Sequence, residues 1–186
     1  MTRQFAVFIL LLLLSSISAL GQDAPQGFEW KHFPELGVTV QVPNAWHSHI
    51  ASAKGTKALQ ITREKIEAKG FETGLTINLI EPGTDAEMSA AITSMGDYMA
   101  KLHDSFTKVV DSRITEMSGV PTWILEGTRT LPDDKARGLY HTRTTVYIFK
   151  ADRRIYTIIF GAPAALWESD YKFGNVMLNP IKFDAK

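Results

Sequence analysis

Residues 84–106 read TDAEMSAAITSMGDYMAKLHDSF and predict the longest helix of the chain. Thr84 followed by Glu87 is a capping box, in which each side chain pairs with a free backbone N–H at the helix start. Asp85 adds a negative charge that favours the same helix end. Apolar side chains then recur at steps of four and three residues, at Met88, Ile92, Met95, Met99, Leu102 and Phe106. We therefore expect one face of this helix to pack against a sheet.

Strand patterns flank this helix on both sides. Alternating or continuous apolar residues predict strands at 28–33, 38–42, 58–63 and 75–79 before the helix, and at 108–117, 121–130, 139–150 and 155–161 after it. Pro163 fits the first turn of a second helix that runs to about Leu178. Its expected buried residues are Leu166, Trp167, Phe173, Val176 and Met177. Together these elements predict an α+β fold, an α/β/α sandwich around a mostly antiparallel sheet.

The first 21 residues, MTRQFAVFILLLLLSSISALG, have the pattern of a cleavable secretory signal. Arg3 supplies the positive charge, residues 5–14 are apolar without interruption, and Ala19 and Gly21 form a small-residue cleavage site. The apolar run is too short to cross a membrane as a helix. We expect residues 1–21 to be the signal, 22–27 a disordered leader and 28–186 a single domain. The predicted location is secreted or periplasmic, without stable membrane insertion after cleavage.

Composition excludes several classes of function. The chain has 186 residues, with 20 Lys and Arg against 20 Asp and Glu, and no cysteine. A balanced charge argues against a nucleic-acid binder, which needs a basic surface. The absence of cysteine excludes thiol catalysis, disulfides and Cys-ligated metal sites. No serine lies in a G-x-S-x-G elbow and no Gly-rich phosphate loop is present, so we expect neither an enzyme nor a cofactor.

Three short motifs resemble the PsbP-like family. Residues 36–46, LGVTVQVPNAW, are similar to that family's opening strand followed by P-x-x-W. Residues 127–160 resemble its second half, and residues 177–183, MLNPIKF, resemble its closing motif. The resemblance implies an α/β/α sandwich around an antiparallel sheet. It also implies action by binding other proteins, since this is how the photosystem subunits and Ran-binding relatives of the family act, and it carries over no catalytic motif.

His47 and His49 form the first candidate site. In an extended segment, residues two apart point to the same side, so the two imidazoles could bind zinc or copper. A metal site needs a third ligand, for which His32, Glu64 and Glu67 are candidates without support from spacing. The alternative is that both histidines are simply exposed.

Glu126, Thr128, His141 and Arg143 form the second candidate, a polar face on two adjacent strands. A carboxylate, an imidazole and a guanidinium on one sheet face could bind an anion or support acid–base chemistry. The favoured interpretation is a solvated outer face with cross-strand ion pairs, because such pairs are common on sheets.

The leading functional hypothesis is an exported, non-enzymatic domain that binds a protein partner. One alternative is a metal-binding or enzymatic module that uses His47 and His49. Another is a small apolar ligand held between the Met-rich helix and the sheet, since methionine side chains adapt to apolar ligands. The sequence does not identify the partner or the oligomeric state.

Overall fold

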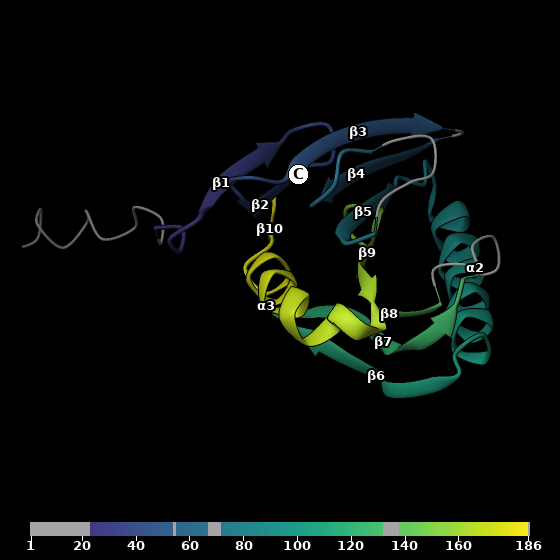
Figure 1. Cartoon of the computed structure of the whole chain (residues 1–186). Helices are drawn as coiled ribbons and strands as arrows, with labels where there is room; N and C mark the ends of the chain where they lie inside the picture. Colours follow the sequence, from purple (N-terminus) through teal and green to yellow (C-terminus); the bar gives the residue numbers. More distant parts are fainter. Residues whose placement is uncertain (1–22, 54, 67–71, 132–137, 186) are drawn as a thin grey trace, which may run out of the picture.

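The computed structural model describes residues 23–53, 55–66, 72–131 and 138–185. The predicted signal and its cleavage point before Gln22 lie outside these residues. Within them the chain forms ten strands, two α-helices and one short 3-10 helix (Figure 1). All strand pairs are antiparallel, so the predicted α+β class is confirmed.

The large sheet has seven strands in the order β3-β4-β5-β9-β8-β7-β6. Their bounds are β3 His47–Ala53, β4 Thr56–Thr62, β5 Gly74–Ile80, β9 Arg154–Pro163, β8 Leu139–Phe149, β7 Val120–Thr130 and β6 Lys108–Met117. Strand β9 lies between β5 and β8, and its apolar residues point to both faces, which fits its central position. Strands β3 and β6 are the two edges of the sheet among the described residues.

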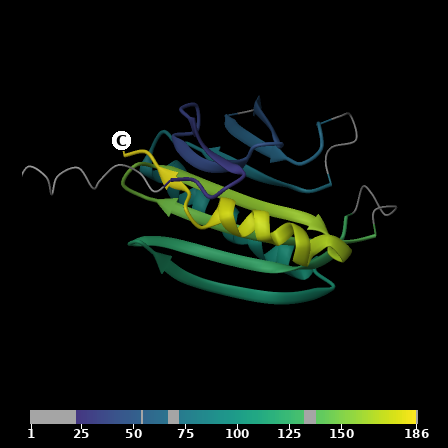
Figure 2. The ribbon, with the colours of Figure 1, turned by 60° about the vertical axis from the view of Figure 1, so that its left-hand side comes forward.

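The other elements cover the two faces of the large sheet (Figures 1 and 2). A small sheet of β1 Phe28–Phe33, β2 Val38–Pro43 and β10 Lys182–Phe183 shares one face with helix α3, Trp167–Leu178. The 3-10 helix η2, Ala164–Leu166, precedes α3. Helix α2, Asp85–Asp104, lies on the opposite face. The result is a helix, a sheet, and a layer that combines a helix with a small sheet.

Helix α2 forms as its sequence predicts. The Thr84 side chain accepts a hydrogen bond from the Glu87 amide, and the Glu87 carboxylate accepts one from the Thr84 amide, so the capping box is complete. Met88 and Met95 pack on Val146, Ile148 and Ile155 of the sheet, which confirms core packing for this part of the stripe.

The core on the α3 face is larger and contains most of the fully buried side chains. Apolar residues from β2, β4, β5 and β9 meet there with Met177 of α3. Tyr156 is fully buried, and its hydroxyl donates to the carbonyl of Leu36 at 2.7 Å. This hydrogen bond ties the turn between β1 and β2 to the central strand.

Several details differ from the predictions. Helix α2 ends at Asp104, so Phe106 lies outside it, half-buried, near Gly127. Helix α3 begins at Trp167, because Pro163 ends β9. Leu166 and Phe173 were expected in the core, but each is 40% exposed.

The edge strand β3 was missed as a strand. Its sequence, HSHIASA, has no apolar alternation, because most of its side chains are exposed and Ile50 packs partly against the core. The leader prediction stays open, although residues 25–27 do form backbone hydrogen bonds: Phe28 donates to Pro25 and Asn44 donates to Gly27.

Candidate functional site

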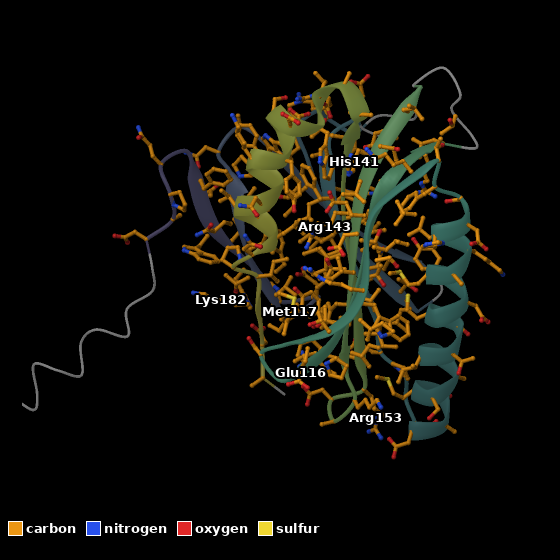
Figure 3. The ribbon with its side chains drawn as sticks, turned by 90° about the horizontal axis from the view of Figure 1, so that it is seen from below. Glu116, Met117, His141, Arg143, Arg153 and Lys182 are labelled. Carbon is orange, nitrogen blue, oxygen red and sulfur yellow. The ribbon has the colours of Figure 1, made fainter. Side chains whose placement is uncertain are left out.

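Figure 3 shows His141 and Arg143 of β8 on the side of the sheet that faces α3. Glu126 of β7 meets both of them there. Glu126 Oε1 lies 3.2 Å from His141 Nε2, and Arg143 Nη1 donates to Glu126 Oε2 at 2.7 Å. The sheet register places Glu126 opposite Arg143 and Thr128 opposite His141, so neighbouring strands bring the predicted residues together. Thr128 is half-buried beside this cluster, and its carbonyl accepts the amide of Thr107.

The first turns of α3 close over this polar cluster. The His141 ring stacks on Trp167 with 3.7 Å between centroids and 3° between planes, and Trp167 stacks in turn on Tyr171. Glu126 and His141 are each only 8% exposed. The predicted cross-strand ion pairs are present, but the prediction that the face is solvated was wrong, because the helix that follows the last strand covers it with aromatic side chains.

The charges of this cluster connect strands β7 and β8. Burial raises the pKa of Glu126, but hydrogen bonds from His141 and Arg143, together with their charge, outweigh it and bring the pKa below its ordinary value. Both carboxylate oxygens are occupied, so Glu126 is a fixed acceptor that joins two strands under α3. A carboxylate held in this way is poorly placed to move a proton to or from a substrate.

His47 and His49 lie on β3, both exposed and with one residue between them. They pair with Thr62 and Gln60 of β4, which supply no metal-binding group of the usual kind. Across the described residues, no three His, Cys, Asp or Glu side chains lie close enough together to hold a metal ion. The two-histidine site stays a prediction.

The proposed third ligands have other contacts. His32 lies on β1 of the small sheet, with Nδ1 3.0 Å from the Thr39 hydroxyl and Nε2 3.6 Å from Asp184. Glu64 accepts hydrogen bonds from Arg63 and from the Thr73 amide. Glu67 lies outside the described residues.

A cleft of about 580 Å³ lies between α2 and the outer strands β6 and β7. Met99 and Trp123 are among its apolar walls, and Gly96 and Ala100 keep the helix side open. A Cβ atom at Gly96 would lie 3.8 Å from the Trp123 ring, at ordinary contact distance, so the missing side chain leaves space rather than relieving a clash. Helix α2 therefore packs closely over β5, β9 and β8, and the cleft lies between the helix and the outer strands β6 and β7.

Strand β6 forms the outer wall of this cleft and is exposed along its length. Half of the large apolar side chains that the described chain exposes lie on this strand: Val109, Val110, Ile114 and Met117. Ile114 is 78% exposed and lies opposite Trp123 in the register, so it projects to the α2 side. An edge strand with this composition is a surface suited to contact with another molecule.

Sequence reasoning missed the cleft, although two signals pointed to it. A glycine and an alanine one helical turn apart, Gly96 and Ala100, interrupt the bulky stripe of α2. The motif VVDSRIT at 109–115 carries valines and an isoleucine without the regular alternation of a strand whose apolar face is covered.

No family model matches the sequence, and no curated protein matches it. Solved structures do resemble it. The solution structure of cyanobacterial PsbP from Synechocystis has a TM-score of 0.54 at 13% identity, covering 89% of this chain and 99% of that one. The chain thus has an α+β sandwich of the PsbP-like fold, and the resemblance seen in the sequence is confirmed for the fold.

Two other structures are more distant. LpqN of Mycobacterium tuberculosis, involved in cell envelope biogenesis, has a TM-score of 0.48 at 10% identity, covering 85% of this chain and 91% of LpqN. The Saccharomyces cerevisiae Ran-binding protein Mog1p has a TM-score of 0.47 at 8% identity, covering 84% of this chain and 95% of Mog1p. At these identities the likeness describes the fold alone. Among the described helices, none has the length and apolar character needed to span a membrane.

Proposed function

We propose that this chain is an exported, non-enzymatic domain that binds a protein partner in the cleft between α2 and β6. The observation that carries the proposal is an apolar cleft that continues onto an exposed apolar edge strand. An open cleft with this lining can accept an apolar side chain of another protein. Such buried apolar side chains usually form the centre of a protein interface.

A protein fits this cleft better than a small apolar ligand does. Small-molecule sites enclose most of the surface of their ligand. Here the outer wall is formed by Ile114, whose side chain is 78% exposed, so a small ligand would remain largely in water. A protein surface would cover Ile114 and the cleft together.

The rim of the cleft is polar. His103 and Asp104 lie at the end of α2, whereas the Arg113 side chain projects to the opposite face of the sheet, beside Asp111. An apolar centre with a polar rim is the usual composition of a specific but reversible protein interface. We expect the partner to present an apolar side chain flanked by polar groups that pair with His103 and Asp104.

A photo-crosslinking side chain at His103, on the cleft rim, tests this proposal in cells that export the protein. A crosslinker at Ala90, exposed elsewhere on α2, is the positional control. The expected result is one discrete protein adduct from position 103 and none from position 90. The captured protein is then purified and titrated against the wild-type chain.

Two matched variants separate binding in the cleft from incidental contact. Ala100→Trp fills the cleft, whereas Ala90→Trp makes the same change away from it. We expect Ala100→Trp to weaken partner binding at least about tenfold, about 1.4 kcal/mol, and Ala90→Trp to leave it unchanged. Equal affinities for the two variants, an adduct consisting only of a second copy of this chain, or a small molecule in the native mass spectrum would each contradict the proposal.

The export part of the proposal rests on residues 1–21. Cleavage after Gly21 makes Gln22 the first residue of the exported protein. Intact mass of the protein recovered from outside the cytoplasm tests this expectation. Protein that keeps residues 1–21 and stays with the membrane would contradict it.

A further inference from the structure

The edge strand β6 has a charge order that is complementary to itself. Its charged residues are Lys108, Asp111, Arg113 and Glu116, so the signs run plus, minus, plus, minus along the strand. About its middle at Ser112, Asp111 and Arg113 carry opposite charges at the same distance, whereas Lys108 lies beyond the register shift at Val110 and is out of step with Glu116. In an antiparallel pair of such strands, opposite charges would face each other.

We infer that β6 is a homodimer edge, at which two copies of this chain pair antiparallel about Ser112 and join their large sheets. In this register Asp111 of each copy lies opposite Arg113 of the other. Because the register with β7 skips Val110, the position two steps before Ser112 is Val109, so Val109 of each copy lies opposite Ile114 of the other. Residues directly opposite in an antiparallel pair have Cβ atoms about 4.5–5.5 Å apart, close enough for ion pairs and apolar contact.

The side-chain directions in the structure agree with this register. Asp111 lies opposite Glu126 of β7 and Arg113 lies opposite Ile124, so both project to the α3 side, 3.6 Å apart within one chain. Ile114 projects to the other side with Trp123. In the dimer the α3 side therefore gains a ring of alternating charges, and the α2 side gains an apolar pair.

The apolar pair joins two exposed side chains, Val109 at 37% and Ile114 at 78%. Val110, which is 54% exposed, is the residue at which the register with β7 shifts, so the regular ladder between copies is interrupted beside it. Lys108 and Glu116 lie opposite Thr128 and Pro121 of β7, on opposite faces of the sheet, so they do not pair in this dimer.

The two neighbouring in-phase registers are disfavoured by charge. Pairing centred on Asp111 or on Arg113 places that residue opposite its own copy, and like charges directly opposite are destabilising. Pairing shifted by a single residue turns the facing side chains to opposite sides of the sheet. A foreign strand would leave these charges unpaired, which is how charged edge strands resist indiscriminate pairing.

The fold leaves this edge accessible. Within the described part of the chain, no strand pairs with the outer side of β6, and Figures 1 and 2 both show β6 outermost. A two-fold axis through Ser112, normal to the sheet, keeps the two α2 helices on one side. The two clefts then open on the same face, with Ile114 shared between the cleft wall and the dimer edge. A single ladder buries little area, so we expect a reversible dimer of micromolar affinity.

Charge reversal tests the inference by sedimentation velocity over a range of micromolar concentrations. Wild-type protein should show a concentration-dependent dimer. Asp111→Arg sets like charges opposite each other at two places and should weaken the dimer at least about tenfold. The double variant Asp111→Arg with Arg113→Asp restores opposite charges and should restore the dimer, a rescue that a merely structural role would not produce. Thermal melts confirm that each variant folds.

Disulfide trapping gives a second measurement, since the wild-type chain has no cysteine. Ser112→Cys places two thiols directly opposite each other at a Cα separation that a disulfide can bridge. Ser52→Cys on β3, the opposite edge of the sheet, is the matched control and should remain monomeric. The inference is overturned if the wild type stays monomeric throughout, if Asp111→Arg leaves dimerisation unchanged, or if Ser52→Cys crosslinks as readily as Ser112→Cys. None of these outcomes alters the adduct expected from position 103, so the two proposals fail separately.

Discussion

Each of the two helices contains one interior glycine, and the two glycines have opposite uses. At Gly174 of α3, a Cβ atom would lie 2.7 Å from the Phe160 ring, so the absent side chain lets helix and sheet approach closely. At Gly96 of α2, a Cβ atom would meet only Trp123, at 3.8 Å. Glycine therefore allows close packing of α3 on one face of the large sheet. On the other face, the glycine of α2 leaves a cleft over the outer strands.

This difference separates the part of the molecule that maintains the fold from the part available for contact. The α3 face carries the large core, sealed at its outer end by the polar cluster of Glu126, His141 and Arg143. The α2 face carries a smaller core and then the cleft. This contrast is why we propose the α2 face and the β6 edge as the binding surfaces.

Met95→Asp should have the largest effect, because it breaks the closed part of the α2 face. Met95 is buried against apolar side chains of the sheet, so a carboxylate there would lose its hydration. We expect a loss of about 4 kcal/mol or failure to fold. Ser94→Asp introduces the same charge at an exposed position of α2 and should change little. Thermal and urea melts compare the two, and equal small losses would mean that Met95 is on a free surface.

Gly174→Ala should cause the second-largest loss of stability, because the added methyl group pushes α3 away from the sheet. The new methyl group meets the fully buried Phe160 ring, which has no free space into which to move. Overpacking of this kind costs about 1–3 kcal/mol, and we expect the upper end of that range despite the gain in helix propensity. Urea unfolding measures the loss. A variant as stable as the wild type would show that α3 can shift without cost.

Glu126→Gln should lower the free energy of unfolding by about 1–3 kcal/mol at neutral pH, because it removes a buried charge that interacts with two partners. Because the pKa of Glu126 is lower in the folded chain, its contribution is present above the ordinary value of 4.5 and is lost as the pH falls through the lowered value. The stability difference between variant and wild type should therefore shrink in acid.

Melts of both proteins across the acidic range measure this difference. Glu35→Gln, at an exposed carboxylate, is the control and should show little difference at any pH. A difference for Glu126→Gln that is independent of pH would mean that packing, rather than charge, accounts for the effect.

Gly96→Ala should give the smallest change, and of opposite sign. Its methyl group meets the Trp123 ring at ordinary contact distance without a clash, so the gain in helix propensity of about 0.5–1 kcal/mol is expected to raise the melting temperature slightly. Together with Gly174→Ala, it tests the comparison directly. A loss of stability at both glycines would show that both helices lie in close contact with the sheet.

Local patterns in the sequence were sufficient for most elements. The capping box at Thr84 and Glu87 and the stripe of α2 predicted its start and its buried face, because both depend on neighbours within one or two turns. The strand at 108–117 was predicted with the bounds that β6 has. Strand β3 was missed because an uncovered edge strand needs no apolar alternation.

Only the tertiary structure decided which surfaces are covered. The sequence brought Glu126, His141 and Arg143 to one face, yet Trp167 from the following helix made that face an interior. It supplied the apolar residues of β6, yet their exposure follows from how far α2 extends across the sheet. Burial depends on contacts between residues far apart in the chain, whereas helix and strand patterns depend on near neighbours. Sequence patterns therefore determined the elements and their faces, and the packing of the layers decided which faces remain free to bind.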